Sequence, residues 1–419
     1  MKSAEKQQKL SRTGIGSTFT TVVIAIMIFA AEILGEKEII FPEIAAICIG
    51  SFITPHVMWK SSIGKIVFYI SVCAILGVLI VRFLHILFWI QFTLGYMIGQ
   101  IIFFFSKTGF APMISAMALP ILLRTDSHVY ILSAIILTAF VMLLTLAYQK
   151  LVLKEKRETM SVPLPWIPFL KSFIYRTVIV AVVAAVCIAV DERIKFCMAP
   201  PLLVAFTELT TKKDLPALKR PVMTVILFTG CAFIGALARY VLSMKCHIPL
   251  TVSVVVVSVG IIVLMKGIKL LFPPAAAMGV LSMLIPEKVV LLYTLDVFIG
   301  ICIWVIAALI YKQLFFTASS KGIAKEVKEM EVKKDSKEDS TEEEEKEKEK
   351  EKDKEEKDKS FESAHTKIDI PDENTNTPGS RNKNNNDDNN SSSNNEGDEI
   401  TINEKNEGDI VNVVLPIYQ

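Results

Sequence analysis

Residues 266–288 read KGIKLLFPPAAAMGVLSMLIPEK, and this stretch decides the class of fold. It begins like a membrane-spanning helix, is interrupted by Pro273 and Pro274, and continues as an apolar run too short to cross a bilayer. Proline lacks a backbone N–H and breaks a helix, and inside a membrane the freed carbonyl groups cannot turn to water. Such a break is tolerated where it is buried in protein or lines a water-filled cavity. We therefore expect a helix that begins inside a membrane domain.

The composition indicates a membrane protein. Hydrophobic residues make up 52% of the 419 residues, and the mean hydropathy is +0.46 although residues 317–419 are almost entirely polar. The rest of the chain is far more apolar than a water-soluble domain, which predicts an all-α, polytopic protein in a lipid bilayer. The net charge of +2 gives no indication of nucleic-acid binding. The seven cysteines lack CxxC spacing, so neither a disulfide framework nor a zinc site is predicted.

Eight apolar segments have the length of about 20 residues that a bilayer requires. They lie near 18–35, 64–83, 84–105, 128–149, 169–190, 221–244, 248–271 and 289–312. Four shorter runs lie between them, near 39–55, 110–123, 198–211 and 272–286. Each short run begins at or near a proline: Pro42, Pro112, Pro200 with Pro201, and Pro273 with Pro274. Short, proline-led runs are typical of half-helices.

The order long, short, long, long, short, long occurs twice, which predicts an internal repeat. FAP at 110–112 corresponds to FPP at 272–274, and YQKL at 148–151 corresponds to YKQL at 311–314. Pro42 and Lys60 precede Pro201 and Lys219 by the same interval. We expect two parallel tandem repeats of about six helical segments each. The predicted divisions are an N-terminal arm (1–17), repeat 1 (18–151), a linker (152–167), repeat 2 (168–316) and a charged, Asn-rich, disordered tail (317–419).

The repeat also predicts the orientation. Each copy crosses the membrane an even number of times, whether its two short segments re-enter or cross, so the N-terminal arm, the linker and the tail share one side. Lysines and arginines in these three segments make that side cytoplasmic by the positive-inside rule. The basic loop 212–220 lies on the same side only if the preceding short run crosses. Six crossings per copy are therefore favoured over four.

The second copy resembles the HPP family of integral membrane proteins, whose motif is His-Pro-Pro followed by small residues. The motif reads FPPAAAMGVLSML here, and the preceding APPLLVAFTELTTKKDLPALKRPVMTV is similar to that family's first proline-led motif and its arginine-bearing loop. The resemblance covers about 190–314 and implies a transporter of a small anion such as nitrite. Phe272, and Phe110 in the first copy, replace the motif histidine. No role of that histidine in proton transfer or hydrogen bonding is carried over.

Broken helices in corresponding places of two repeats predict a binding site between the repeats near the membrane midplane. Half-helix N-termini direct partial positive charge at such a site, which favours an inorganic anion as the solute. The candidate pathway residues on the broken helices are Pro42, Phe110, Pro112, Pro201, Phe272, Pro273 and Pro274. The alternative is that these prolines, with the small residues that follow them, only serve packing.

Four ionisable residues within or beside apolar segments are further candidates, because a charge in hydrocarbon is costly and often functional. Arg82 and Arg239 occupy corresponding places, and a guanidinium matches a planar oxyanion; alternatively, both reach out to the membrane interface. Glu43 and Glu208 lie in or beside the first short run of each copy. Either carboxylate could pair with an arginine, carry a coupling proton or have only a structural role.

Signatures of an enzyme are lacking. The histidines are not at metal-binding spacing, and no HExxH motif or phosphate-binding glycine loop occurs, so the sequence predicts neither catalysis nor a cofactor. Two functions remain. The first is a transporter or channel for a small solute, and the alternative is a non-transporting receptor or scaffold whose tail docks a protein partner. Deleting residues 317–419 separates them, because only transport should survive the deletion; a homo-oligomer is compatible with both.

Overall fold

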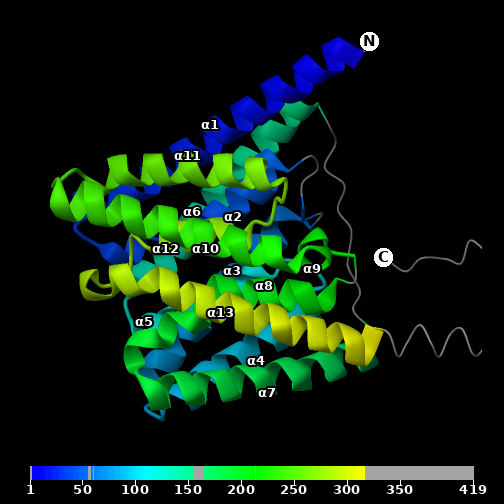
Figure 1. Ribbon diagram of the computed structural model, residues 1–419, viewed down its shortest axis with the longest axis vertical. Coiled ribbons are helices and arrows are strands. Elements are labelled where there is room, and N and C mark those ends of the chain that lie inside the picture. The colour runs from blue at the N-terminus through cyan, green and yellow to red at the C-terminus, as the bar shows by residue number, and fades with distance from the viewer. Residues whose placement is uncertain (1, 55–57, 60, 155–164, 213, 317–419) are drawn as a thin grey trace, which may run out of the picture. The chain divides into compact units, whose positions relative to one another are not determined.

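The computed structural model describes residues 2–54, 58–59, 61–154, 165–212 and 214–316, without the side chains of 2–13, 153 and 316. Helices make up most of this part of the chain, and no strand occurs in it (Figure 1). Eight of the described helices are long and apolar enough to cross a membrane, which supports an integral, multi-pass membrane protein. The predicted tail, most of the predicted linker and Lys60 lie outside the described residues.

The long helices are α1 (Lys2–Leu34), α3 (Ile63–Phe83), α4 (Phe88–Ser106), α6 (His128–Tyr148), α7 (Trp166–Val190), α10 (Pro221–Ala238), α11 (Leu250–Ile268) and α13 (Val290–Tyr311). A π-helical turn extends α6, α10 and α13: η3 (Gln149–Leu153), η5 (Arg239–Lys245) and η7 (Lys312–Phe316). Serine caps begin two of the long helices, since Ser62 accepts a hydrogen bond from the Lys65 amide and Ser127 from the Val129 amide. Apolar side chains on their outer faces, such as Val182 at 55% exposure, suit a lipid environment rather than water.

Four short helices lie between the long ones: α2 (Glu43–Cys48), α5 (Pro112–Leu123), α8 (Pro200–Thr211) and α12 (Pro274–Leu281). A π-helical turn, η2 (Ile49–Ile53), extends α2. The remaining elements are the single turns η1 (Lys37–Ile39), α9 (Pro216–Lys219) and η6 (Glu287–Val289) and the longer 3₁₀ helix η4 (Glu192–Met198). Proline suits the start of each short helix because the first amides of a helix have no intrahelical partner and the ring presets φ.

Each short helix returns the chain to the opposite end of the bundle. After α1 ends, α2 and η2 bring Phe52 back beside Gly16, near the start of the apolar part of α1 (Gly14–Leu34). After α4 ends, α5 leads to Asp126, which lies beside Arg82 at the end of α3. The second half of the chain does the same, since α12 is followed by Ile285, which accepts a hydrogen bond from Arg239 at the end of α10. The short segments therefore cross the bundle rather than re-enter.

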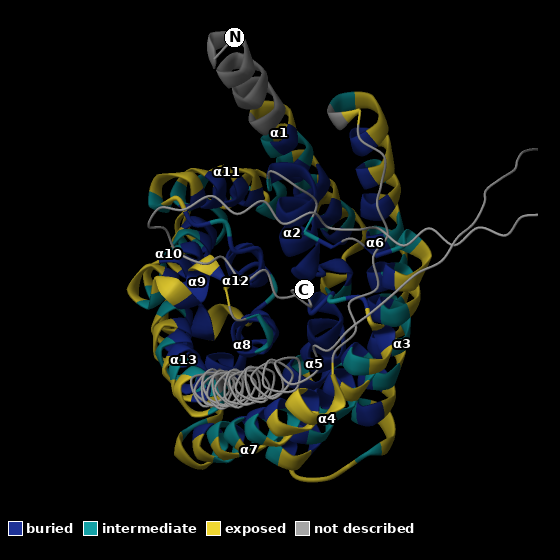
Figure 2. Cartoon of the chain, turned by 90° about the vertical axis from the view of Figure 1, so that its right-hand side faces the viewer, coloured by how far each residue is buried: buried dark blue, intermediate teal, exposed yellow. Residues whose placement is uncertain are grey.

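The first helix of each half packs against the other half. We call residues 14–153 the first half and residues 166–316 the second half. In the first half α3 packs against α4, α5 and α6, and in the second half α10 packs against α11, α12 and α13. By contrast, α1 lies along α11, and α7 lies along α4 (Figures 1 and 2). Glu32 of α1 secures one of these contacts by accepting hydrogen bonds from the first amides of α11, at Leu250 and Thr251.

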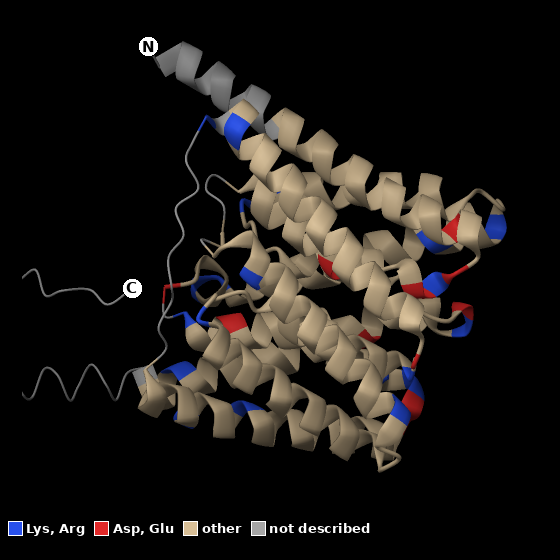
Figure 3. Ribbon diagram, turned by 180° about the vertical axis from the view of Figure 1, so that it is seen from behind, with Lys and Arg blue, Asp and Glu red and all other residues tan. Residues whose placement is uncertain are grey.

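The two ends of the described bundle differ in charge (Figure 3). At the end where α1 begins, most charged residues are basic, and Asp214 is an acidic residue among them. The basic residues there are Lys65, Lys107, Lys150, Lys154, Lys212, Lys219, Arg220, Lys266, Lys269 and Lys312. The opposite end carries both signs, as Glu36, Lys37, Glu38, Arg82, Arg124, Asp126, Asp191, Glu192, Arg193, Lys195, Lys245, Glu287 and Lys288. We refer to these as the basic end and the mixed end.

Candidate functional site

The four short helices meet in the middle of the bundle. Helix α2 contacts α5, α5 contacts α8, α8 contacts α12, and α12 contacts α2, so they form a closed ring that both halves share (Figure 2). We call these four helices the core ring. Their residues are buried, except for two at the ends of α5 and α8, Leu123 and Thr211. The core ring is therefore where the proline-led segments predicted from the sequence come together.

The candidate prolines lie at the starts of the core-ring helices. Pro112 and Pro274 are the first residues of α5 and α12, and Pro201 is the second residue of α8. Pro42 and Pro273 occupy the positions just before α2 and α12. At these positions proline removes an amide that would otherwise be an unsatisfied donor inside the bundle. Each helix can thus begin at membrane depth with fewer unsatisfied backbone groups.

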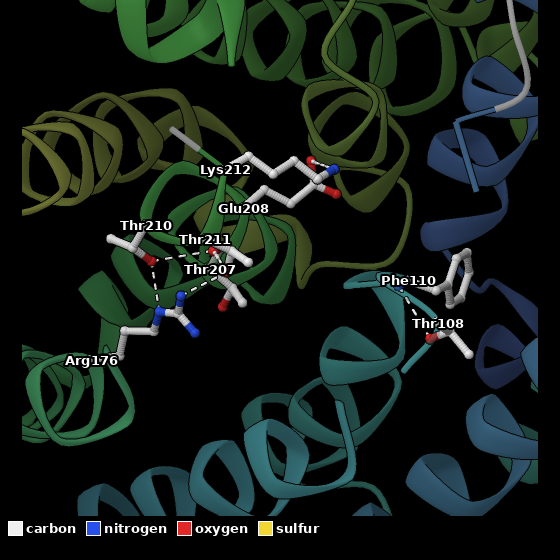
Figure 4. Close-up of polar contacts among 8 residues, drawn as sticks. All are labelled: Thr108, Phe110, Arg176, Thr207, Glu208, Thr210, Thr211 and Lys212. Carbon is white, nitrogen blue, oxygen red and sulfur yellow. Dashed lines mark hydrogen bonds and ion pairs between the residues drawn. The ribbon is translucent and has the colours of Figure 1, made fainter. Parts of the chain in front are cut away.

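Phe272 and Phe110, the two phenylalanines that precede the proline-led helices α12 and α5, are packed into aromatic pairs. Phe272 is 1% exposed and lies edge-on to Phe228 of α10, with ring centroids 5.6 Å apart. Phe110 is fully buried against Trp59, at a centroid distance of 4.9 Å. The Phe110 amide donates a hydrogen bond to the hydroxyl of Thr108 (Figure 4). These side chains provide apolar packing, and they offer no group that could exchange a proton.

Glu43 is a carboxylic acid inside the core ring. It is 1% exposed, and the hydroxyl of Ser115 of α5 donates a hydrogen bond to its Oε1. Its Oε2 has no hydrogen-bond partner among the described residues. The site therefore places one incompletely bonded carboxyl group where α2 meets α5.

Two other buried acids lie in the second half. Glu208 of α8 is 2% exposed, and its Oε2 lies 3.4 Å from Nζ of Lys212, while Oε1 has no hydrogen-bond partner within the described residues. Asp296 of α13 is also 2% exposed and has one unpartnered oxygen. Neither acid is paired with an arginine in the described structure, so the predicted carboxylate–arginine pairing does not occur there.

Arg82 and Arg239 lie in different surroundings. The Arg239 side chain is buried, and its Nη1 donates hydrogen bonds to the carbonyls of Ser282 and Ile285, the second at 2.5 Å. It thus binds the C-terminal end of α12, where the helix dipole favours a cation. Arg82 is 44% exposed at the mixed end, 4.0 Å from Asp126 and 3.3 Å from the ring of His128. Only Arg239 reaches the core ring.

Arg176 of α7 is 2% exposed and was not among the candidates predicted from the sequence. Its Nε donates to Thr210 Oγ1 at 2.6 Å, and Nη2 donates to Thr211 Oγ1 at 2.7 Å (Figure 4). An arginine inside an apolar segment is a functional candidate by default, which is the signal that could have found it.

Charged side chains at the mixed end join the two halves. Arg124, which follows α5, lies 3.1 Å from Glu192 of η4, and its guanidinium covers the ring of Phe88. Burial lowers the pKa of Lys195, next to this pair, and the nearby Glu192 partly opposes that shift. The pKa of Asp191 is lowered because the Arg193 side chain and amide donate hydrogen bonds to its carboxylate.

Comparison of the chain with protein-family models, with curated proteins and with solved structures finds no match. The residues of the core ring and their contacts therefore carry the functional argument.

Proposed function

We propose that this protein is a transporter or channel for a small solute, with its pathway through the core ring. The observation that carries the proposal is that four proline-led helices, two from each half, begin inside the bundle and meet one another there. Helices that begin at membrane depth are tolerated where they serve a buried site or a cavity, and in transporters they commonly surround the solute. The core ring is buried, so passage requires the two halves to move apart at this place.

The proposal includes a duplication of one unit. Its support is that corresponding residues make corresponding contacts: Tyr130 Oη donates to the carbonyl of Ala116 at 2.8 Å, and Tyr293 Oη donates to that of Met278 at 2.7 Å. The turns before α5 and α12 also match, because Lys107 and Lys269 both have left-handed backbone conformations, with φ of 50° and 55°. Two copies in parallel orientation would place similar half-helices on both sides of one pathway.

We further propose that the basic end is cytoplasmic. The support is the excess of lysine and arginine at that end, which the positive-inside rule assigns to the cytoplasm. The chain enters and leaves the described bundle at this end, so the N-terminus and the tail would both be cytoplasmic.

For the solute we propose a small inorganic anion, for which nitrite is the example that the resemblance to the HPP family implies. The dipoles of α5, α8 and α12 begin at buried prolines and favour negative charge. Glu43 would carry a proton that accompanies the anion, because an ionised carboxylate in the core ring would repel it. The receptor or scaffold alternative depends on the tail, which lies outside the described residues.

Replacing both Pro273 and Pro274 with alanine tests the role of the core ring. We expect an inserted protein whose anion flux falls by roughly tenfold or more, because two alanines add buried amide donors at the start of α12 and remove the fixed φ that sets where this helix begins. The measurement is nitrite uptake into proteoliposomes that contain equal amounts of wild-type or variant protein.

The matched control is Pro286→Ala, which removes an exposed proline from the mixed end just after α12. Its flux should equal that of the wild type. Equal flux in the double variant as well would mean that the two prolines serve packing alone.

A further inference from the structure

Arg176 carries a buried positive charge that no carboxylate balances within the described part of the chain. A guanidinium stays protonated in proteins, and burying its charge without a counter-charge is unfavourable. Its two hydrogen-bond partners there are the neutral hydroxyls of Thr210 and Thr211, at the C-terminal end of α8. The local structure therefore solvates the guanidinium without neutralising it.

The dipole of α8 provides part of the missing negative charge. The Thr210 hydroxyl donates onward to the Phe206 carbonyl at 2.7 Å, and the Thr211 hydroxyl donates to the Thr207 carbonyl at 2.6 Å. Both hydroxyls thus connect Arg176 to carbonyls in the last turns of the helix. A helix C-terminus is equivalent to about half an elementary charge, so about half of the guanidinium charge remains unbalanced.

The nearest candidate for a counter-ion points elsewhere. Glu208 belongs to the same helix, but it lies on another face of α8 and approaches Lys212 instead (Figure 4). The ionisable side chains that do lie near Arg176 are the phenols of Tyr96 and Tyr311, which are ordinarily neutral. The described chain thus supplies no full negative charge at this place.

Two hydrogen-bonding groups at this place lack partners among the described residues. The guanidinium Nη1 makes no hydrogen bond within the described residues, since only Nε and Nη2 have partners. On the facing helix α4, Gln100 Nε2 donates to Thr177 while its Oε1 is buried without a partner. Turning this amide by 180° would let Oε1 accept from Thr177 and would place N–H donors where the unpartnered Oε1 now lies. Tyr96 Oη, one turn away, shares a hydrogen bond with Thr207 at 2.9 Å.

We propose that Arg176 is the binding site for a small monovalent anion, enclosed by α4 of the first half and by α7 and α8 of the second. This inference rests on the proposed function and names a place where its anion binds. The anion supplies the counter-charge and accepts hydrogen bonds from Nη1 and from the Gln100 amide. The lysines and Arg220 of the basic end, toward which α8 runs, raise the local anion concentration.

Nitrate is the probe for the test, because it is planar, matches a guanidinium fork and stays ionised at every working pH. Purified full-length protein is unfolded by heat in detergent while nitrate replaces gluconate at constant ionic strength. A bound anion stabilises the folded state, so the melting temperature of the wild type should rise and saturate with nitrate. In Arg176→Gln the apparent nitrate affinity should fall by about ten- to a hundredfold, the loss expected for a charge-assisted hydrogen bond.

The matched control is Arg193→Gln, which removes an exposed arginine at the mixed end and should leave nitrate binding unchanged. If Arg176→Gln does not fold, the same nitrate titration is carried out on Gln100→Leu, which should also bind nitrate more weakly than the wild type. A wild type that nitrate does not stabilise, or a folded Arg176→Gln with unchanged affinity, overturns the site. Nitrite flux in proteoliposomes is measured separately. A protein that transports nitrite but is not stabilised by nitrate would contradict the site at Arg176 alone, whereas a protein without nitrite flux would contradict the proposed function.

Discussion

At the scale of single residues, Arg82 and Arg239, which the predicted repeat places in corresponding positions, lie in different surroundings. Arg239 lies inside the bundle and binds two carbonyls beyond the last turn of α12, so its loss would leave buried acceptors without donors. Arg82 is partly exposed and lies 4.0 Å from Asp126, an arrangement that usually contributes little to stability. The two arginines should therefore respond differently to the same substitution.

We expect Arg239→Ala to lower the free energy of unfolding by about 2–4 kcal/mol, since two buried carbonyls lose a charged donor. Arg82→Ala should lower it by less than about 1 kcal/mol. Unfolding of the purified variants by heat or denaturant in detergent measures both. Equal and small decreases in the free energy of unfolding would show that Arg239 does not stabilise the C-terminal end of α12. Arg82→Lys and Arg239→Lys, assayed for anion flux, test the predicted pathway role independently of stability.

At the scale of elements, close helix contacts hold the core ring in place. Gly77 of α3 faces α5, and a Cβ atom there would approach the Met117 carbonyl oxygen to 2.5 Å. In the second half Gly235 of α10 faces Gly279 of α12 in the same way. The hydrophobic effect does not drive membrane helices together, because lipid is as apolar as the helices. Small residues at the contact instead let the two backbones approach closely and pack tightly.

The substitution Gly77→Ala should destabilise the protein by about 1–3 kcal/mol, because the added methyl group forces α3 away from α5. Gly64→Ala in the same helix is the matched control, since a Cβ there meets nothing within 4 Å. It should be neutral or slightly stabilising, as alanine is the better helix former. Thermal unfolding in detergent compares the two. Similar melting temperatures would indicate that the contact between α3 and α5 is loose enough to absorb a methyl group.

At the scale of the whole described bundle, the two ends are distinguished by charge and by one reactive side chain. Cys246 is exposed at the mixed end, while the other six cysteines are buried or partly buried. Lys219 is half exposed at the basic end, 2.8 Å from Asp214. These two positions therefore report on opposite sides of the membrane.

If the basic end is cytoplasmic, a membrane-impermeant maleimide should label Cys246 from outside sealed, right-side-out vesicles. Lys219→Cys in a Cys246→Ser background should stay unlabelled until the vesicles are opened, because its side faces the lumen. The fraction labelled, read on a gel, decides the orientation. The reverse pattern would place the N-terminus and the tail outside the cell, against the positive-inside rule.

The sequence alone was enough to predict membrane insertion, the eight long helices and the four proline-led short ones. The physical reason is that the hydrocarbon core of a bilayer allows few backbone structures. The backbone of an apolar span forms a helix, and that helix needs a fixed length to cross the bilayer. A proline between two apolar runs interrupts such a helix. These are properties of consecutive residues. Candidate positions such as Pro112, Pro274 and Glu43 could therefore be named before any contact was known.

Only the tertiary structure decided which helices are neighbours. Lipid-facing and protein-facing surfaces of these helices are both apolar, so the sequence pattern does not indicate that α1 packs against α11 or that α7 packs against α4. The packing of α7 against the first half brings Arg176 against α8 and next to α4, where no described carboxylate pairs with it, while Arg82 stays at the exposed mixed end. The value of a charge in a membrane protein depends on its surroundings, and contacts between distant segments create those surroundings.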